Sequence, residues 1–314
     1  MSRYSMFAPA GMGELAMPSS LNQVRKAVIP VAGLGTRLLP VTKSQPKEML
    51  PVGRKPAVQY IVEELEAAGI RDMLLVTGRK KTAIEDHFDP DPELRQRLTA
   101  AGNTDLLELL NFAENDTAFY YVRQSTQSGN GDAVRLGRRF CGDDVFVVAF
   151  GDSIIKSNGR KSVLDRMIET HLLRHSSCTV AVERVPEEDA PKYGVVVPAE
   201  PVDERFDISD LVEKPARGTA PSNLAIAARY VFSPEIFDAL DVTPPGKGGE
   251  VWLADAIRIL LKQGRRVTCV TLNEGEQRYD IGNFESYYRA FVDFALADER
   301  YGYLLRQYLM RKLG

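Results

Sequence analysis

The sequence predicts an α/β fold: a doubly wound (Rossmann-like), mostly parallel mixed sheet, joined to a smaller β-rich half and to C-terminal helices. Two observations lead to this prediction. Through the first half of the chain, short apolar runs alternate with amphipathic segments of helical spacing, the pattern of a sheet covered by helices on both faces. With 314 residues, the chain is also long enough to build one large α/β domain around an apolar core.

The elements of the first half follow one another in regular alternation. In the helix expected over Pro56–Ala68, Val58, Ile61 and Leu65 recur at three- and four-residue spacing, and Gly69 ends it. The buried strands are expected at Lys26–Val31, Asp72–Thr77, Ala118–Arg123, Asp144–Phe150 and Cys178–Arg184. The other helices are expected at Lys81–Phe88, Pro92–Ala101, Asp105–Phe112, Gly131–Phe140 and Ser162–His175.

The second half is richer in short strands and ends in helix. Strands are expected at Gly194–Pro198, Asp207–Glu213, Asn223–Phe232 and Arg266–Leu272, a helix at Val251–Gln263, and mostly helix over Asn283–Leu313. The last segment carries an aromatic stripe at helical spacing, namely Phe284, Tyr287, Tyr288, Phe291 and Phe294. Such a stripe indicates packing against the body of the protein or a partner subunit.

Composition narrows the class of protein. The formal net charge of −3 gives no reason to expect a nucleic-acid partner, and no apolar run is long enough to span a membrane. The first twenty residues carry one basic residue, Arg3, and no continuous apolar core, so they do not resemble a signal peptide. The three cysteines, Cys141, Cys178 and Cys269, are far apart, which fits reduced thiols in the cytoplasm.

The histidines do not indicate a metal site. His171 and His175 are four residues apart on an expected helix and could share a face, but no third ligand is apparent nearby. We therefore expect both to face solvent. His87 is expected to have a structural role.

The segment from Lys26 to Leu50 carries the clearest chemical signal. A short apolar strand leads into a turn through Gly33 and Gly35, followed by Thr36-Arg37 and then by Lys47. A glycine-rich turn lets backbone N–H groups approach phosphate oxygens, and Arg and Lys supply positive charge. Fold logic places it on one sheet edge with the other loops that follow strands, at Thr77–Arg79, Gln124–Gly131 and Gly151–Asp152.

Other readings of the turn fit less well. The dinucleotide-binding pattern would need a third glycine where Leu38 stands and an acidic residue about twenty positions further on, and neither is present. The G-K-[ST] of a P-loop is also absent. An ordinary βα turn with incidental charges is the remaining alternative. Thr36-Arg37 and the attached run Pro46–Pro51, PKEMLP, argue against it, because they stand at the spacing of a family signature that this segment resembles.

The motif G-L-G-T-R-x-L-P-x-T-K-x-x-P-K-E-M-L-P resembles the nucleotide-binding signature of the sugar-1-phosphate nucleotidylyltransferases, in particular the bacterial UTP–glucose-1-phosphate uridylyltransferases. The resemblance extends over most of the chain, from about residue 24 to 295. It implies that a sugar-1-phosphate oxygen attacks the α-phosphorus of a nucleoside triphosphate and that pyrophosphate is released. UTP and glucose-1-phosphate would be the substrates, Mg²⁺ the cofactor, and the β-rich half would bind the sugar.

The resemblance also implies roles on the nucleotide side. The glycine-rich loop would wrap the nucleotide, Arg37 and Lys47 would neutralise the phosphates, and the Gln124 amide would read the uracil edge as both donor and acceptor. Asp152 and Asp280 would hold Mg²⁺; Asp280 rests on the resemblance alone. The full nucleotide-binding set is Ala32, Gly33, Gly35, Thr36, Arg37, Lys47, Gln124, Gly129 and Gly131.

On the sugar side, the resemblance rests on three short segments. They are Tyr193-Gly194-Val195, Glu213-Lys214-Pro215 and Gly249-Glu250. Glu213 and Glu250 would accept hydrogen bonds from sugar hydroxyls, and Lys214 would bind the sugar phosphate and count among the catalytic residues with Arg37, Lys47 and Asp152. A solvated strand end is the alternative for Glu213-Lys214.

The chain departs from the family pattern at three places. Asp132 replaces the histidine of G-x-G-H-A, and we expect it to cap the helix that begins there. Gly151 replaces the proline of L-P-D and should make the approach to Asp152 more flexible. Trp252, the only tryptophan, replaces the glutamine of E-I-Q-L-T-D and could reshape the sugar pocket or a subunit contact.

These readings give a domain plan. Residues 1–22 are expected to be a flexible tail, 23–295 the catalytic domain, and 296–314 a C-terminal helix for packing or oligomer contact. The protein is expected to be a cytoplasmic homodimer or homotetramer. A pyrophosphorylase for another hexose phosphate or for dTTP, and a non-catalytic regulatory paralogue, are the alternatives; the absent dinucleotide pattern makes an NAD-dependent oxidoreductase a remote one.

Overall fold

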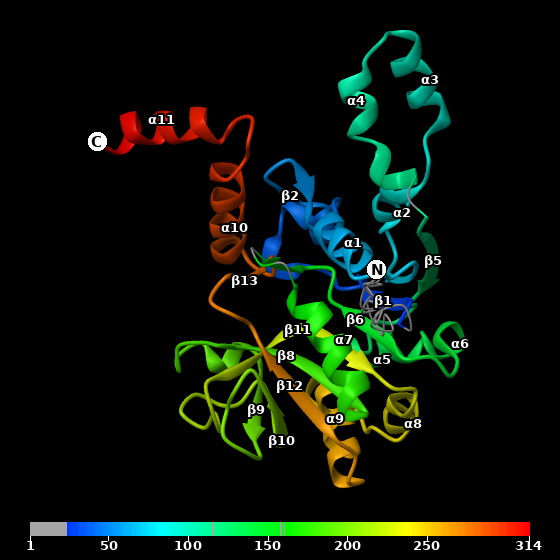
Figure 1. Cartoon of the computed structure of the whole chain (residues 1–314), viewed down its shortest axis with the longest axis vertical. Coiled ribbons are helices and arrows are strands. Elements are labelled where there is room, and N and C mark those ends of the chain that lie inside the picture. The colour runs from blue at the N-terminus through cyan, green and yellow to red at the C-terminus, as the bar shows by residue number, and fades with distance from the viewer. Residues whose placement is uncertain (1–23, 115, 158, 160) are drawn as a thin grey trace, which may run out of the picture.

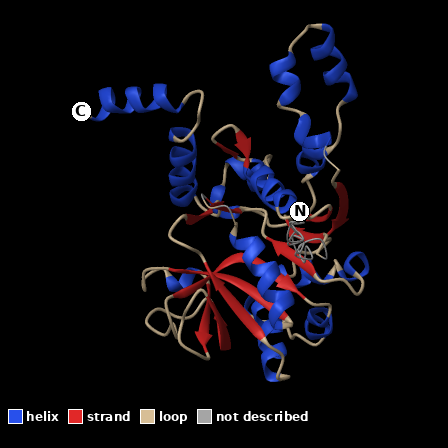
Figure 2. Cartoon of the chain, viewed as in Figure 1, coloured by secondary structure: helices blue, strands red, loops and turns tan. Residues whose placement is uncertain are grey.

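The computed structural model describes residues 24–314 except 115, 158 and 160 (Figure 1). The prediction made for residues 1–22 therefore lies outside the described residues. Figure 2 shows a large strand-rich body, with helices α3 and α4 projecting from one end and α11 extending sideways. None of the helices in the described part of the chain is both long and apolar enough to cross a membrane.

A nine-stranded mixed sheet forms the centre of the body. Its strands lie in the order β5 (Ala118–Arg123), β4 (Asp72–Thr77), β1 (Lys26–Pro30), β6 (Phe146–Ala149), β11 (Leu224–Phe232), β8 (Cys178–Arg184), β12 (Val267–Thr271), β10 (Arg205–Glu213) and β9 (Gly194–Pro198). Strands β5, β4, β1 and β6 are parallel to one another, whereas β11 runs antiparallel to both β6 and β8. The predicted α/β fold is confirmed, with the antiparallel pairs gathered in the second half.

Helices cover both faces of the sheet. On β1, the side chains of Ala27 and Ile29 belong to the apolar core on one face of the sheet, and that of Val28 belongs to the core on the other face. This alternation is what the two-residue period of a strand requires. The first layer contains α1 (Ala57–Ala67) and α7 (Val163–Arg174), and the second contains α5 (Asn130–Arg135), α8 (Glu235–Asp241) and α9 (Leu253–Lys262). Two apolar cores therefore cover the two faces of the sheet, so a ligand site is expected at the strand ends.

Three predicted helices are divided. The one expected at 131–140 becomes α5 and α6 (Arg138–Cys141), because Gly137 N donates to Val134 O in a tighter turn. The one expected at 105–112 becomes α4 (Thr104–Glu108) and a short 3₁₀ turn at Asn111–Glu114. The C-terminal segment forms α10 (Phe284–Leu296) and α11 (Gly302–Leu313), while α2 (Thr82–Phe88) and α3 (Pro92–Ala100) lie close to their predicted positions.

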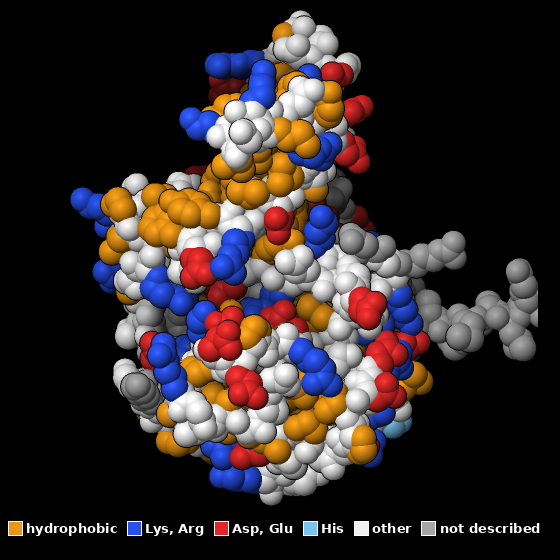
Figure 3. Space-filling view, turned by 90° about the vertical axis from the view of Figure 1, so that its left-hand side faces the viewer, with side chains coloured by type: hydrophobic (Ala, Val, Ile, Leu, Met, Phe, Trp, Pro, Cys, Tyr) orange, Lys and Arg blue, Asp and Glu red, His pale blue; other side chains and the backbone are white. Residues whose placement is uncertain are grey.

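The aromatic stripe of α10 is divided between core and surface. Phe294 packs against Tyr60 and Tyr279, with ring centroids 4.8 and 5.3 Å apart. Tyr288 and Phe291 remain exposed, and α11 adds exposed Leu304. Figure 3 shows the side of the molecule that is on the left in Figure 1, and hydrophobic side chains gather on its upper part. Part of the stripe therefore holds α10 to the body, and an oligomer contact through the rest stays a prediction.

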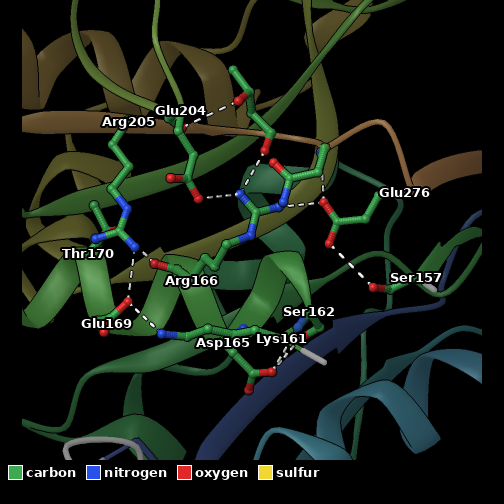
Figure 4. A network of polar contacts seen from close by, with 12 residues as sticks. Ser157, Lys161, Ser162, Asp165, Arg166, Glu169, Thr170, Glu204, Arg205 and Glu276 are labelled. Carbon is green, nitrogen blue, oxygen red and sulfur yellow. Dashed lines mark hydrogen bonds and ion pairs between the residues drawn. The ribbon is translucent and has the colours of Figure 1, made fainter. Parts of the chain in front are cut away.

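A two-stranded antiparallel ribbon joins distant parts of the chain. It pairs β7 (Ser153–Ser157) with β13 (Glu276–Asp280), and a second small ribbon pairs β2 (Pro51–Val52) with β3 (Lys55–Pro56). Arg166 on α7 holds the start of β13: its guanidinium pairs with Glu276 and donates to Thr271 O at 3.0 Å (Figure 4). The Arg166 and Glu276 side chains are only 5% and 3% exposed. This enclosed ion pair therefore fixes β13 against the body.

We predict that Arg166→Ala lowers the free energy of unfolding by about 3–5 kcal/mol, because it leaves the enclosed Glu276 carboxylate without its partner. Arg97→Ala is the matched control. Arg97 pairs with Glu93 on the surface, where both side chains are 75% exposed and water screens the pair. Urea unfolding of both variants tests this. Equal losses in the two variants would contradict a special role for Arg166.

Candidate active site

The glycine-rich loop opens onto a cavity of about 370 Å³. We call it the loop cavity. Among the residues predicted to bind nucleotide or metal, Ala32, Gly33, Gly35, Thr36, Lys47, Gln124, Gly129 and Asp152 line it. They come from loops that follow β1, β5 and β6 and from the 3₁₀ turn Lys47–Met49. The structure thus brings together segments that are more than one hundred residues apart, at the sheet edge where strand order predicts a ligand site.

The shape of the loop depends on its backbone. Gly35 has φ +66°, a conformation that side chains rarely adopt, and its carbonyl accepts a 2.7 Å hydrogen bond from the Thr42 hydroxyl. On the neighbouring loop after β4, a Cβ at Gly78 would lie 3.0 Å from Ala32 O, so the two loops touch. The walls of the cavity are therefore fixed by backbone packing.

A buried pair of opposite charges forms the floor of the loop cavity. The Lys47 ammonium contacts the Asp152 carboxylate. Burial disfavours the charge on each group, but their attraction outweighs it, raising the pKa of Lys47 and lowering that of Asp152. Next to Lys47, the buried Glu48 pairs with Lys81 at 2.6 Å. Each carboxylate at the floor thus has its own ammonium partner.

Asp280 lies beside this pair because of the β7–β13 ribbon. Ile281 N donates to Asp152 O at 2.8 Å, and Asp280 is in register with Ser153. Burial raises the pKa of Asp280, and the negative charge of Asp152 raises it further. The exposed Arg37 lies close to Asp280, and both side chains lie against Gly282. A Cβ placed on Gly282 would be 2.8 Å from the Arg37 guanidinium and 2.7 Å from Asp280 Oδ1.

The two aspartates fit a magnesium site on chemical grounds. Asp280 ends β13 and Asp152 comes just before β7, the strand paired with β13, and a divalent cation would relieve the mutual repulsion of the two carboxylates. Mg²⁺ usually takes one or two carboxylates and completes its shell with substrate phosphates and water. Within the described residues there is no cluster of three or more His, Cys, Asp or Glu side chains that could hold a metal alone. The donor set therefore suits a cation that arrives with a phosphate ligand.

Gln124 lines the loop cavity, but its amide is engaged differently from the prediction. Its nitrogen donates to Asp132 Oδ2 at 2.8 Å and to Gly129 O at 3.1 Å. Asp132 also accepts from Arg135 at 2.6 Å. The prediction that Asp132 caps the helix is wrong, since α5 has Gly129 at its N-cap and no side-chain cap. The carboxylate instead holds Gln124.

Close backbone approach explains both glycines of the next loop. Gly129 has φ +102° and packs against the Val251 carbonyl, and Gly131 N donates to the same carbonyl at 2.9 Å. This pairing carries Glu250 to the wall of the loop cavity. Its contact with a sugar hydroxyl stays a prediction. Gly131 itself does not line the cavity; it holds the Glu250 segment in place.

The residues predicted for the sugar side form a second group. Glu213 is in register with Gly194, and the Lys214 ammonium lies 3.7 Å from Glu213 and 4.2 Å from the Trp252 ring centre. Burial raises the pKa of Glu213, which Lys214 partly offsets. Trp252 therefore belongs to this group as the aromatic surface under Lys214, not to a surface remote from the site.

Tyr193 and Asp280 line a separate cavity of about 610 Å³ beside β13. Arg278 also lines it and stacks 4.3 Å over the Tyr193 ring while pairing with Glu183. Asp152 lines the loop cavity and Asp280 this one, so each of the two cavities has one of these carboxylates in its lining.

Gly151 does not make the approach to Asp152 loose. A Cβ at this position would overlap Val31, and Gly151 N donates to Pro30 O at 3.4 Å. The expectation of a more flexible approach is wrong, because the glycine is buried against the first strand. It lets β6 deliver Asp152 close to the glycine-rich loop.

The comparisons with known proteins agree with this geometry. Residues 26–296 match the family model described as nucleotidyl transferase. The chain belongs to this nucleotidyl transferase family. It is 45% identical over 281 residues to the UTP–glucose-1-phosphate uridylyltransferase of Bacillus subtilis (strain 168), covering 89% of this chain and 94% of the relative. A relative from Methanocaldococcus jannaschii, named as a putative enzyme of the same kind, is 44% identical over 274 residues, covering 86% of this chain and 93% of that relative.

Solved structures of the family share the fold. A UTP-bound UGPase from Acinetobacter baumannii has a TM-score of 0.84 at 35% identity and covers 91% of this chain and 99% of its own. A UDP-glucose pyrophosphorylase complexed with UDP-glucose has a TM-score of 0.79 at 37% identity and covers 88% and 100%. The resemblance stated from the motifs is confirmed.

Sequence reasoning missed some residues of this nucleotidyltransferase site. Gln127 and Asn130 line the loop cavity within a segment that was predicted to reach the sheet edge, so its position was the only available signal. Glu48 lies inside the PKEMLP run and is 1% exposed, and its place in that run was a signal that could have been used. Arg278 gave no signal, because its role depends on the β7–β13 pairing.

The cysteines and histidines lie outside this site. The three cysteines are buried and free of disulfides, as predicted. The prediction that His171 faces solvent is wrong: it is 2% exposed and its ring nitrogens lie 3.1 Å from the hydroxyls of Thr179 and Ser233. His175 is exposed and ends α7 with a left-handed backbone. His87 contacts Gln59 and stacks on Phe112.

Burial of His171 gives a pH prediction. Burial lowers its pKa from the usual 6.5 to about 4, so between these values the unfolded chain binds a proton that the folded chain does not. Stability should fall as pH drops through this window, by about 3 kcal/mol in total from this group. Urea unfolding at several pH values should show a smaller fall for His171→Gln. Parallel curves for the two proteins would contradict the assignment.

Proposed function

We propose that this protein transfers a uridylyl group from UTP to glucose-1-phosphate and so makes UDP-glucose and pyrophosphate. The observation that carries the proposal is the Lys47–Asp152 pair in the lining of the glycine-rich loop cavity, with Asp280 beside it. The named activities of the relatives and the UTP and UDP-glucose held by the related structures support the choice of substrates.

In this reaction a phosphate oxygen of glucose-1-phosphate bonds to the α-phosphorus of UTP. The bond from that phosphorus to the bridging oxygen of the β-phosphate breaks, and pyrophosphate leaves. No covalent bond to the protein is needed, so catalysis is positioning and charge stabilisation. Arg37 and Lys47 would spread the charge that develops on the phosphates, the glycine-rich loop would offer backbone N–H groups to them, and Gln124 would contact the base.

Asp152 and Asp280 are the residues that would hold Mg²⁺. The cation would neutralise the phosphate oxygens as charge builds on them. Lys214 would bind the sugar phosphate, Glu213 and Glu250 would accept from sugar hydroxyls, and Tyr193 and Gly194 would wall the sugar. The glycine-rich loop cavity would receive the nucleotide with Glu250 at its rim. The oligomeric state and the cytoplasmic location stay predictions.

The first test is pyrophosphate release by the full chain with Mg²⁺. UTP, dTTP, ATP, CTP and GTP would each be paired with glucose-1-phosphate, and UTP with other hexose-1-phosphates. Release with UTP and glucose-1-phosphate above all other pairs is expected. Preference for dTTP or another sugar would replace the proposed substrates, and no release from folded protein would favour a regulatory role.

Asp152→Asn should lower turnover by about 10²–10³-fold, because it removes the negative charge that would hold the cation. Asp144→Asn is the matched control, since Asp144 also pairs with a lysine, Lys26 at 2.7 Å, but its side chain is 62% exposed. That variant should keep normal turnover. Normal turnover of Asp152→Asn at any Mg²⁺ concentration would refute the metal assignment.

Trp252→Ala should raise the KM for glucose-1-phosphate about two- to fivefold, because the ring no longer holds the Lys214 ammonium. Trp252→Phe, which keeps an aromatic face, should have a smaller effect, and the KM for UTP should not change in either variant. Steady-state kinetics with each substrate varied in turn measures this. A change confined to the KM for UTP would place Trp252 elsewhere in the mechanism.

A further inference from the structure

Gln124 holds a fixed orientation at the wall of the loop cavity. Its amide nitrogen faces Asp132 Oδ2 and Gly129 O, at 2.8 and 3.1 Å. A carboxylate paired with arginine and a backbone carbonyl can only accept hydrogen bonds, so the nitrogen, with its two N–H groups, must face them. The opposite orientation would set the amide oxygen against two acceptors. Chemistry therefore determines which way this amide points.

The Gln124 oxygen is left for a ligand. Among the described residues none donates a hydrogen bond to Oε1, and Oε1 is not one of the fully enclosed polar atoms without a partner. Gln124 lines the loop cavity although it is only 4% exposed. Since both amide hydrogens are used, the side chain offers the cavity an acceptor and no donor. This differs from the donor-and-acceptor role expected from the sequence.

Asp132 is itself held in place. Arg135, one turn further along α5, donates to Asp132 Oδ1 at 2.6 Å, so each carboxylate oxygen has its own partner. The Asp132 side chain is 12% exposed, whereas that of Arg135 is 45% exposed and does not line the loop cavity. The chain Arg135–Asp132–Gln124 thus runs from the surface to the cavity wall.

We propose that Asp132 is a positioning residue for base selection: by accepting one amide hydrogen of Gln124 while Gly129 O accepts the other, it leaves only the amide oxygen for the cavity, which then selects a base that donates from its ring nitrogen. This rests on the proposed function, in which the loop cavity receives a nucleotide. Uracil carries a hydrogen on N3, which can be donated to Gln124 Oε1. Cytosine presents an unprotonated N3, an acceptor that would face another acceptor.

The test compares UTP and CTP binding to the full chain by calorimetry, and the kcat/KM of each with glucose-1-phosphate. Wild-type protein should prefer UTP in both measurements. Asp132→Asn should lower the UTP-to-CTP ratio about tenfold or more, since an asparagine amide can turn to donate to Gln124 and let it reverse. Asp238→Asn is the control: Asp238 also pairs with an arginine, Arg138, but on the surface, so the ratio should not change.

A second variant covers the case in which Asp132→Asn does not fold. Arg135→Gln changes an exposed side chain and frees Asp132 to move, so the ratio should fall in the same direction by a smaller factor. An unchanged ratio in every folded variant of Asp132 and Arg135 would overturn the proposal, as would equal binding of UTP and CTP by wild type. UTP-selective binding that Asp132→Asn weakens, in the absence of turnover, would overturn the proposed reaction while supporting the role of Asp132.

Discussion

The candidate site depends on the contact between Lys47 and Asp152, because a buried charge is costly unless an opposite charge accompanies it. Their attraction keeps both groups ionised and moves the pKa of each in the direction that favours its charge. A polyanion entering the loop cavity would compete with Asp152 for the Lys47 ammonium. Under the proposed function, that exchange would release the carboxylate to a cation at the moment the phosphates arrive.

The second carboxylate reaches this pair through architecture outside the main sheet. Asp280 comes at the end of β13, which pairs with the strand that follows Asp152. Arg166 holds the first residue of β13 to α7, and Arg229, which is fully buried, pairs with Glu64 and donates to Ser153 O at 2.8 Å. Both ends of the ribbon are thus fixed by enclosed arginines, which limits how far the two aspartates can separate.

The sequence predicted well whatever depends on local pattern. The strand before Gly33, the helix after Pro56 and the placement of Asp152 at the sheet edge follow from apolar period and strand order. Asp280 could not be placed in this way, since its ribbon joins segments more than a hundred residues apart. Glu250 was predicted to contact a sugar hydroxyl, and only the tertiary pairing of Val251 with Gly131 reveals that it lines the loop cavity.

The three departures from the family pattern share a physical logic. Asp132 contacts Gln124, Trp252 lies under Lys214, and Gly151 makes room for the strand that carries Asp152. Under the proposed function, each of the three residues packs against or supports a group that would contact the nucleotide, the sugar phosphate or the cation. A substitution in that position can change how a contacting group is held without removing it. The chemistry of the family is thereby kept while its selectivity can vary.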